Sequence, residues 1–314
     1  MTRRSRLASA LVAASALVLL PALPGHAAGN GRWSVTPTPP AVAGPAPRVY
    51  FFLESPPGQT VLDSVRVANV SDKPLTFLIY GADAFNTATD GGFGLAAATD
   101  PQHGIGSWTS VSATTVVIPA KSQSDIPFTI TVPPNAPPGD HVGGIVAGEA
   151  VPSGQTSDGG MTVNVRQAVA ARVYLRVSGA AVPGLAVSDL RASGDELSYT
   201  LANTGNVHLV PTISVRSSGL FGHGVRQTGA VPQLDLVPGA VTRLRSGLAG
   251  AWPVDIVTTK VTVTAEGGVT TSSSTTVLLG VWPALAVLLL AALLAVWLVR
   301  RRVRARRLRP RRLV

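Results

Sequence analysis

Residues 65–75 read VRVANVSDKPL, and residues 199–209 read YTLANTGNVHL. Each stretch is an apolar segment that ends in an asparagine, Asn69 or Asn203, and continues through a polar turn into a new segment. An asparagine side chain hydrogen-bonds readily to nearby backbone and tolerates unusual φ values, so it starts turns. A proline-led turn follows each copy further along the chain. The repeat predicts two modules of similar plan, each an immunoglobulin-like β-sandwich.

Short alternating segments surround both copies of the repeat. Residues 126–132 (IPFTITV), for example, alternate apolar with less apolar positions, the period of two expected for a half-buried strand. Turns rich in Gly and Pro separate such segments, as in PPNAPPGD at 133–140. The sequence therefore predicts an all-β chain of two tandem immunoglobulin-like β-sandwich domains, over residues 48–179 and 183–266.

The two ends of the chain predict export and membrane anchoring. Residues 1–28 combine arginines, an apolar run and small residues in the order of a secretory signal peptide. Residues 277–299 read VLLGVWPALAVLLLAALLAVWLV, and these 23 residues would extend roughly 34 Å as a helix, enough to cross a hydrocarbon core of about 30 Å. We expect one C-terminal transmembrane helix there, with the lipid bilayer as its partner.

The orientation of this helix follows from the arginines after it. The segment 300–314 holds nine arginines, beginning with Arg300, Arg301, Arg302 and Arg304. Such a cluster keeps its end of a helix in the cytoplasm. We expect a single-pass type I protein of the cell membrane, with an exported body facing the cell wall and a short, Arg-rich cytoplasmic tail.

Two polar segments flank the predicted sandwiches. Residues 29–47 (GNGRWSVTPTPPAVAGPAP) are rich in proline and predict an extended, disordered leader. Residues 267–276 (GGVTTSSSTT) predict a polar stalk that spans at most roughly 35 Å. We therefore expect the sandwiches to stay near the membrane.

The net charge of +10 belongs to the ends of the chain. Without three arginines of the signal and nine of the tail, 14 basic residues face 16 acidic ones, so the exported body carries about −2. A body with this charge has no electrostatic reason to bind nucleic acid. The absence of cysteine excludes disulfides, thiolate metal sites and a cysteine nucleophile.

No pattern of catalytic or cofactor-binding residues stands out in the body. Residues 92–97 (GFGLAA) match a dinucleotide-binding turn, but no βαβ pattern surrounds them. The histidines lack the spacing of a metal pair, and neither a serine-hydrolase motif nor an evident pair of glycosidase carboxylates occurs. We expect no enzymatic activity, no cofactor and no metal.

Trp108 is a candidate ligand-binding residue. It follows the glycine-rich GIGS and opens a predicted strand, where an indole ring serves either as a core anchor or as a stacking platform for a sugar. A free sheet edge offers a different mode of binding, since it accepts a strand from a partner protein.

The first sandwich resembles the DUF916 family, the peptidoglycan-binding domain of WxL-interacting surface proteins. The resemblance covers about residues 48–179. It rests on Tyr50-x-x-Leu53, Pro57-Gly58, Asp63-x-Val65-x-Val67-x-Asn69, Tyr80-x-x-Asp83, Trp108, Pro119, Phe128, Val132-Pro133 and Pro138-Gly139-Asp140-His141-x-Gly143-Gly144-Ile145. The overall layout of signal peptide, two β-rich domains, membrane span and basic tail is also similar to that family.

The resemblance implies a function for each domain. In the family the first domain is implicated in peptidoglycan binding and the second in binding WxL-domain or host proteins. The second domain of this chain departs from the family pattern and looks like a generic immunoglobulin-like module. Within the matched motif, Asp140 and His141 either form a turn into a buried strand or lie at the rim of a glycan or peptide site.

Together these patterns predict a non-enzymatic, membrane-anchored surface protein that binds peptidoglycan or another cell-wall polymer through its first sandwich. The alternative is an adhesion or assembly scaffold that binds a protein, WxL-like or from a host, along a sheet edge. A wall-active hydrolase is a third possibility, for which the sequence offers no catalytic residues.

Overall fold

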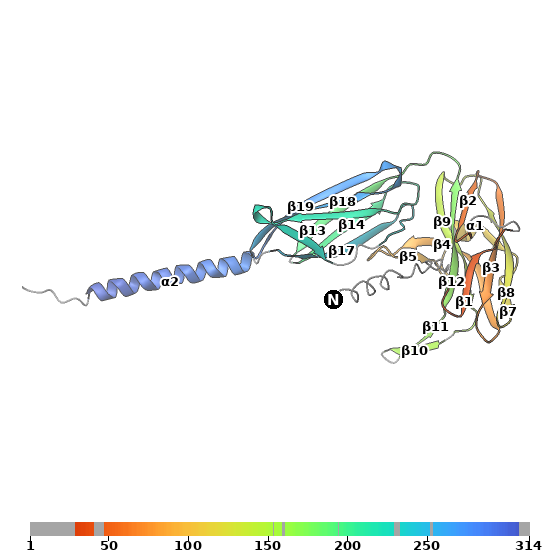
Figure 1. Cartoon of the computed structure of the whole chain (residues 1–314), viewed down its shortest axis with the longest axis horizontal. Coiled ribbons are helices and arrows are strands. Elements are labelled where there is room, and N and C mark those ends of the chain that lie inside the picture. Colours follow the sequence, from red (N-terminus) through yellow and green to blue (C-terminus); the bar gives the residue numbers. More distant parts are fainter. Residues whose placement is uncertain are drawn as a thin grey trace, which may run out of the picture.

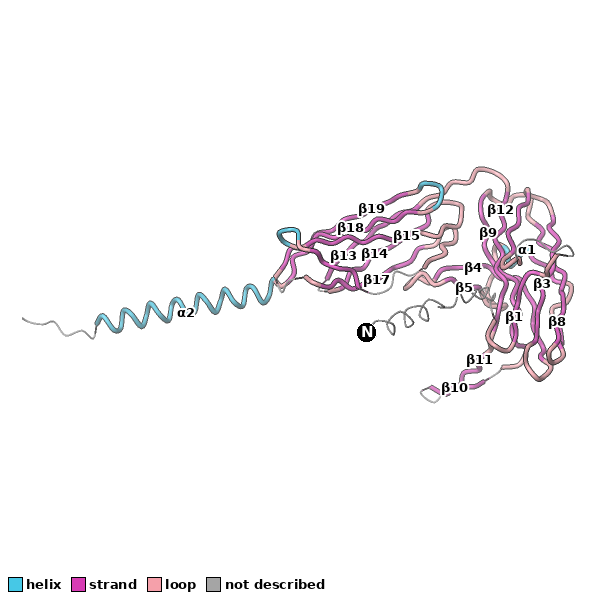
Figure 2. The backbone as a smooth tube through the Cα atoms, in the orientation of Figure 1, coloured by secondary structure: helices cyan, strands magenta, loops and turns pink. Residues whose placement is uncertain are grey.

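The computed structural model describes residues 29–40, 47–152, 154–158, 161–193, 195–228, 233–251 and 254–307. Two β-sandwich domains follow one another along the chain, and a single long helix extends beyond the second (Figure 1). Strands make up nearly all of the regular structure in both domains (Figure 2). The all-β, immunoglobulin-like class predicted from the alternating segments is confirmed. The predicted signal peptide at 1–28 lies outside the described residues, as do residues 308–314 of the predicted tail.

The first domain packs two sheets face to face. The four-stranded sheet has the order β1-β3-β8-β6, and the six-stranded sheet has the order β2-β12-β9-β4-β5 with β7 also paired to β4. Strands β10 and β11 form a separate hairpin. The elements are β1 (Trp33–Pro37), β2 (Phe51–Ser55), β3 (Thr60–Asn69), β4 (Leu75–Asn86), β5 (Phe93–Leu95), α1 (Ile105–Trp108), β6 (Thr109–Val111), β7 (Thr115–Ile118), β8 (Ser122–Thr131), β9 (Gly139–Glu149), β10 (Gly154–Asp158), β11 (Met161–Val165) and β12 (Ala168–Val177).

The core of this domain comes from the inward-facing positions of the two sheets. Phe51 of β2 and Phe128 of β8 meet edge to face in its centre, with ring centroids 5.1 Å apart. Alternation places Phe128 and Ile130 inward and Thr129 and Thr131 toward the other face, as the period-two pattern requires. With no cysteine in the chain, this apolar packing holds the two sheets together.

The predicted disordered leader is wrong for residues 33–37, because they form β1. This strand pairs with β3 in the register Trp33↔Asn69 and buries Trp33 and Val35 completely in the core. The Trp33 indole N–H donates a hydrogen bond to the carbonyl oxygen of Ala147, 3.3 Å away in the other sheet. The alternation in WSVTP drives this burial, although the prolines around it suggested an extended leader. The first domain therefore begins about fifteen residues earlier than predicted.

The second domain is a curled seven-stranded sheet with the order β13-β14-β17-β16-β15-β18-β19. Strands β13 and β19, at the two ends of this order, also contact each other. The elements are β13 (Leu185–Ser193), β14 (Glu196–Asn203), β15 (Thr212–Ser218), η1 (Leu220–Gly222), β16 (Gly224–Thr228), β17 (Val241–Ala249), β18 (Asp255–Thr264), η2 (Glu266–Gly268) and β19 (Thr270–Leu279).

The predicted stalk at 267–276 is wrong as well. Residues 270–279 form β19, which pairs along its whole length with β18, from Thr264↔Thr270 to Asp255↔Leu279. The threonines of TTSSSTTV suit an exposed strand, since β-branched residues fit a pleated surface. The second domain therefore ends at residue 279, and residues 277–279 of the predicted span belong to its last strand.

The helix α2 (Val281–Arg307) follows after one residue, Gly280. Its side chains are described over residues 285–302 and are exposed to solvent throughout. In the part of the chain that the structure describes, no helix combines the length and apolarity needed to cross a membrane. The membrane span at 277–299 and the cytoplasmic tail stay predictions.

The sequence repeat corresponds to one recurring hydrogen-bond arrangement. Buried Asn69 donates from Nδ2 to the carbonyl oxygens of Lys73, Ile118 and Pro119, and its Oδ1 accepts the backbone N–H of Ser71. Buried Asn203 does the same in the second domain, where its Nδ2 donates to Val207, Leu236 and Val237 and its Oδ1 accepts from Gly205. Each asparagine bonds to the backbone of its own turn, as predicted. It also ties that turn to the later proline-led turn, which the sequence did not predict.

Candidate binding site at the domain junction

The two domains share part of a hydrophobic core where they meet. Val142 of β9 and Tyr174 of β12 belong to the first domain by sequence, but both lie buried in the core of the second. Ala84 and Phe93 are half-buried against the same core. Because these side chains leave water only when the domains are docked, the junction is a packed interface and positions the two domains relative to each other.

Asp140, at the start of β9, is the polar centre of this junction. Its carboxylate accepts two hydrogen bonds of 2.7 and 2.9 Å from the Arg176 guanidinium on β12. Oδ2 also accepts the backbone N–H of His208, at 3.0 Å, and lies 2.9 Å from Nδ1 of the same residue. Burial raises the pKa of Asp140, but the hydrogen bonds from His208 and Arg176 outweigh it and hold the pKa well below its usual range. Both oxygens of Asp140 are therefore engaged within the protein.

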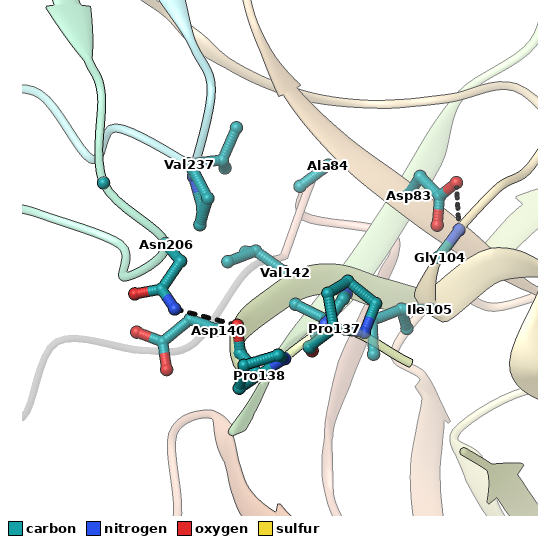
Figure 3. Close-up of a pocket in the computed structure, with 13 residues that line it drawn as sticks. Asp83, Ala84, Gly104, Ile105, Pro137, Pro138, Asp140, Val142, Asn206 and Val237 are labelled. Atoms are coloured by element: carbon teal, nitrogen blue, oxygen red, sulfur yellow. Dashed lines mark hydrogen bonds between the residues drawn. The ribbon is translucent and has the colours of Figure 1, made fainter. Parts of the chain in front are cut away.

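The backbone before Asp140 approaches the second domain closely. The Asp140 N–H donates to the carbonyl oxygen of Asn206 at 2.7 Å, and Asn206 Nδ2 donates to the carbonyl oxygen of Pro138 at 2.9 Å (Figure 3). Gly139, between them, has φ +118°, and a Cβ there would lie 2.2 Å from the Asn206 oxygen. Glycine is required at this position by both conformation and space. The Pro138-Gly139-Asp140-His141 motif is thus a turn into a largely buried strand that also docks the second domain.

Trp108 and His141 lie together beside this turn. Their ring centroids are 4.5 Å apart, Trp108 packs partly against the first core, and His141 Nε2 lies 3.0 Å from the Pro137 carbonyl oxygen. A cavity of about 370 Å³ opens next to them, and Figure 3 shows its walls. It is lined by Asp83, Ala84, Gly104, Ile105, Pro137, Pro138, Asp140, His141, Val142, Gly205, Asn206, Val237 and Pro238. Of the three predicted site residues, Trp108 and His141 are in contact, and Asp140 points to the other domain.

A larger hollow, which we call the junction groove, lies along the outer face of β12. Its volume is about 550 Å³, and it has one wall from each domain. It is lined by Tyr50, Phe52, Phe93, Arg172, Tyr174, His208, Val210, Gln233, Leu234 and Asp235. Two smaller hollows share lining residues with it and continue to Arg176 in one direction and Ala168 in the other. At about 3.3 Å per residue, this path along β12 is roughly 26 Å long.

Aromatic rings cover the floor of the junction groove. Phe52 is 68% exposed and stacks on Tyr174, with ring centroids 5.2 Å apart and an angle of 13° between the planes. Tyr50 meets the Tyr174 ring at an edge, 5.9 Å away, and the His208 ring lies 4.7 Å from it on the second domain. An exposed phenylalanine held in a stack presents a flat apolar face to any ligand that enters.

Polar groups fix this floor in place. Arg172 donates a 2.9 Å hydrogen bond to Asp235 of the second domain, and its guanidinium lies 3.9 Å from the centre of the Phe93 ring. The Tyr174 hydroxyl also donates to Asp235. Burial, followed by the bond to Asp235, raises the pKa of Tyr174, so the phenol stays protonated as a donor.

The sequence reasoning did not single out the junction groove. Its floor joins residues 50–52 to residues 172–174, which are far apart in the chain and meet because β2 pairs in parallel with β12 in the register Phe52↔Tyr174. One signal was present: RVYFF and ARVYL both carry aromatic or arginine residues on the strand face opposite the core face. An outward-facing aromatic in two strands is the pattern that indicates such a surface.

Among the residues that the structure describes, no group of three or more His, Asp or Glu side chains is placed to hold a metal ion. The four histidines of this part lie apart along the chain. His141 and His223 contact the carbonyl oxygens of Pro137 and Leu220, and His208 contacts the carboxylate of Asp140. The arrangement at the junction offers stacking and hydrogen bonding to a ligand.

Comparisons with known proteins found structural likeness at low sequence identity. No protein-family model matches it, and no curated protein matches its sequence. A chain of the chaperone–tip adhesion subunit pre-assembly complex from the archaic chaperone–usher Csu pili of Acinetobacter baumannii is 12% identical, with 73% of this chain and 94% of that chain covered and a TM-score of 0.40. The CupB2 chaperone of Pseudomonas aeruginosa is 10% identical, with 72% of this chain and 95% of that chain covered and a TM-score of 0.37. A chain from the complex of the Salmonella enterica SafA pilin with the SafB chaperone is 12% identical, with 78% of this chain and 96% of that chain covered and a TM-score of 0.36. Nothing about a ligand follows from likeness at this level.

Proposed function

We propose that this chain is a non-enzymatic cell-surface protein, anchored in the membrane through residues 281–299 of α2, whose first sandwich binds peptidoglycan or another cell-wall polymer. The observation that carries the proposal is the exposed Phe52 ring, stacked on the buried Tyr174 ring in the floor of the junction groove. The resemblance of residues 48–179 to the DUF916 family points to the same ligand and itself stays a prediction.

The shape and chemistry of the groove suit a linear polymer. The apolar faces of sugar rings pack on flat aromatic side chains, while their hydroxyl groups need donors and acceptors at the edges of the site. Phe52 supplies the flat face, and Glu54 and Arg176 line the continuation of the groove with charged groups. The path of roughly 26 Å along β12 is long enough for several units of an extended chain.

Sedimentation with insoluble peptidoglycan tests this function. The full chain, purified in mild detergent, is expected to pellet with purified wall in a saturable way and to stay in the supernatant when wall is omitted. Full recovery of the chain in the supernatant at every amount of wall would overturn the proposal. Release of soluble muropeptides from the pellet would instead favour a wall-active hydrolase.

A second candidate function is supported by the free edge of β2. Among the strand pairings that the structure describes, β2 pairs with β12 alone, and β2 borders the junction groove. The Ser178 N–H, just after β12, donates a hydrogen bond to the Ser55 carbonyl oxygen. Because the backbone groups of successive strand residues point to opposite sides, the N–H and carbonyl of Glu54 point away from β12, toward the free edge. A partner protein can add a strand at such an edge while its side chains enter the adjacent hollow.

The substitutions Glu54→Pro and Glu54→Gln separate the two functions. Proline removes the outward N–H and blocks strand addition, whereas glutamine keeps the backbone and removes only the charge. Loss of binding to a purified surface protein with E54P but not with E54Q would favour the scaffold. If both variants sediment with wall as the natural chain does, and neither they nor the natural chain bind a surface protein, the result would favour binding of a wall polymer.

A further inference from the structure

The end of the second domain from which α2 leaves carries exposed apolar side chains. The loop between β15 and β16, which holds η1, lies next to Asp255 at the start of β18, opposite the end of β19. Figure 2 shows it as the short cyan turn beside the start of α2. Phe221 in this loop is 90% exposed, an extreme value for a large aromatic residue. Leu220, Val254, Ile256 and Leu278 are also exposed. We call Leu220, Phe221, Val254, Ile256 and Leu278 the apolar tip.

The hydrogen bonds of the fold bring these residues together. The Leu220 N–H donates a 2.8 Å bond to Oδ1 of Asp255, whose chain neighbours are Val254 and Ile256. Ile256 and Leu278 face each other across β18 and β19. The apolar tip is therefore one patch built from three segments of the chain.

The loop holds Phe221 outward in a strained conformation. Phe221 has φ 59° and ψ 18°, the left-handed region that bulky residues avoid. Two backbone bonds close the loop around it, from Gly222 N–H to the Gly219 carbonyl oxygen and from Gly219 N–H to the His223 carbonyl oxygen, at 3.0 and 2.9 Å. A bulky apolar side chain kept at a strained and exposed position indicates a contact outside the domain.

The position of the apolar tip identifies that contact. β19 ends at Leu279, opposite Asp255, and α2 begins at Val281. Two residues of chain span at most about 7 Å. If residues 281–299 of α2 enter a bilayer, the tip is therefore held at the level of the lipid headgroups, where aromatic and aliphatic side chains partition favourably.

We propose that the apolar tip inserts into the outer interface of the bilayer and docks the second domain on the membrane surface. This inference rests on the proposed membrane anchoring and adds a second, peripheral contact with lipid. Docking fixes the direction in which the first domain and its junction groove project toward the cell wall, which a flexible stalk would not do.

Single cysteines carrying a nitroxide label test the docking, since the natural chain has no cysteine. The full chain is reconstituted in nanodiscs of phosphatidylcholine and phosphatidylglycerol, and collision rates with oxygen and with a water-soluble nickel chelate are compared. A label from Ile256→Cys is expected to show a several-fold higher oxygen-to-nickel ratio than one from Val182→Cys. Val182 is similarly exposed but lies next to Asn206 at the junction end of the domain.

A label from Leu290→Cys in α2 tests membrane anchoring separately from docking of the apolar tip. If the 290 label collides freely with the nickel chelate, the membrane anchoring itself is overturned. If the 290 label is shielded while the 256 label is as accessible as the 182 label, anchoring holds and the docking is overturned.

Phe221→Asn provides a second test, which is read from the same label at position 256. Asparagine tolerates left-handed φ, so this variant should fold at least as well as the natural chain. It removes the aromatic ring from the tip and is expected to lower the oxygen-to-nickel ratio of the 256 label toward that of the 182 label. A ratio that does not change would contradict a role for Phe221 in docking.

Discussion

The carboxylate of Asp140, in the first domain, accepts the backbone N–H of His208, in the second, at 3.0 Å and lies 2.9 Å from the ring nitrogen of that residue. The same carboxylate accepts two hydrogen bonds from the Arg176 guanidinium in the first domain, so one buried acid links the two domains. The junction groove lies beside this link, because His208 also lines the groove and contacts Tyr174. The geometry of the candidate site therefore depends on how firmly the domains are docked.

Asp140→Asn should weaken the whole fold. It removes the charge that Arg176 and His208 share, and we expect the free energy of unfolding in urea to fall by roughly 2–3 kcal/mol. Asp125→Asn is the matched control, since Asp125 forms an equally short two-bond pair with Arg66 but is exposed. A surface pair contributes about 0–1 kcal/mol, so equal losses in the two variants would contradict a special role for Asp140.

The stability of the protein at acidic pH should depend on the same group. Because the folded pKa of Asp140 lies below its unfolded value, its contribution is complete above pH about 4 and is lost as the pH falls toward the folded pKa. Urea unfolding between pH 6 and 2 is the measurement, and the difference between the natural chain and D140N should shrink with falling pH. A constant or growing difference would show that the pKa of Asp140 is not depressed.

Gly139→Ala should disturb the docking of the domains. Its Cβ would meet the Asn206 carbonyl oxygen in the second domain, and its φ of +118° is unfavourable for alanine. We expect a loss of roughly 2–4 kcal/mol in the free energy of unfolding. Gly31→Ala, at φ +81° with open space around it, isolates the conformational cost of about 1 kcal/mol. Similar losses in both variants would mean that the domain contact adds nothing.

Phe52→Ala should weaken wall binding without affecting folding, because the ring is largely exposed. Removing the stacked face is expected to lower the affinity for peptidoglycan about tenfold, the equivalent of about 1.4 kcal/mol. Leu62→Ala, an exposed apolar residue on β3 in the other sheet, is the control and should bind normally. His141→Ala tests the neighbouring cavity: a large loss with H141A and none with F52A would move the binding site to the Trp108–His141 pair.

A soluble fragment of the protein should form a stable second domain only if it includes β19. A fragment of residues 29–280 keeps β19, whereas one ending at 270 exposes the edge of β18 and leaves its core uncovered beside Val277. We expect the shorter fragment to unfold at least about 10 °C lower or to aggregate, as judged by thermal denaturation and gel filtration. Equal melting temperatures would show that β19 is dispensable.

Local sequence patterns were enough to predict the fold class, the number of modules and the turn at the end of each repeated strand. These features depend on local patterns: alternation over five to ten residues sets strands, and Asn69 and Asn203 each close a turn within four residues of themselves. The two missed strands show the limit of that reasoning. β1 lies next to prolines, and the first seven residues of β19 are serine and threonine. Their composition therefore indicated linkers, and only pairing with β3 and β18 makes them strands.

The positions of the candidate sites depend on long-range contacts between strands and between domains. Phe52 and Tyr174 are separated by most of the first domain in sequence, and Asp140 and His208 belong to different domains. Which side chains meet across strands and domains depends on strand order and register, which no local pattern encodes. The same holds for the apolar tip, where a loop, a strand start and a strand end converge at one end of the second domain. Local periodicity fixes the elements, and the long-range pairing of those elements fixes the surfaces.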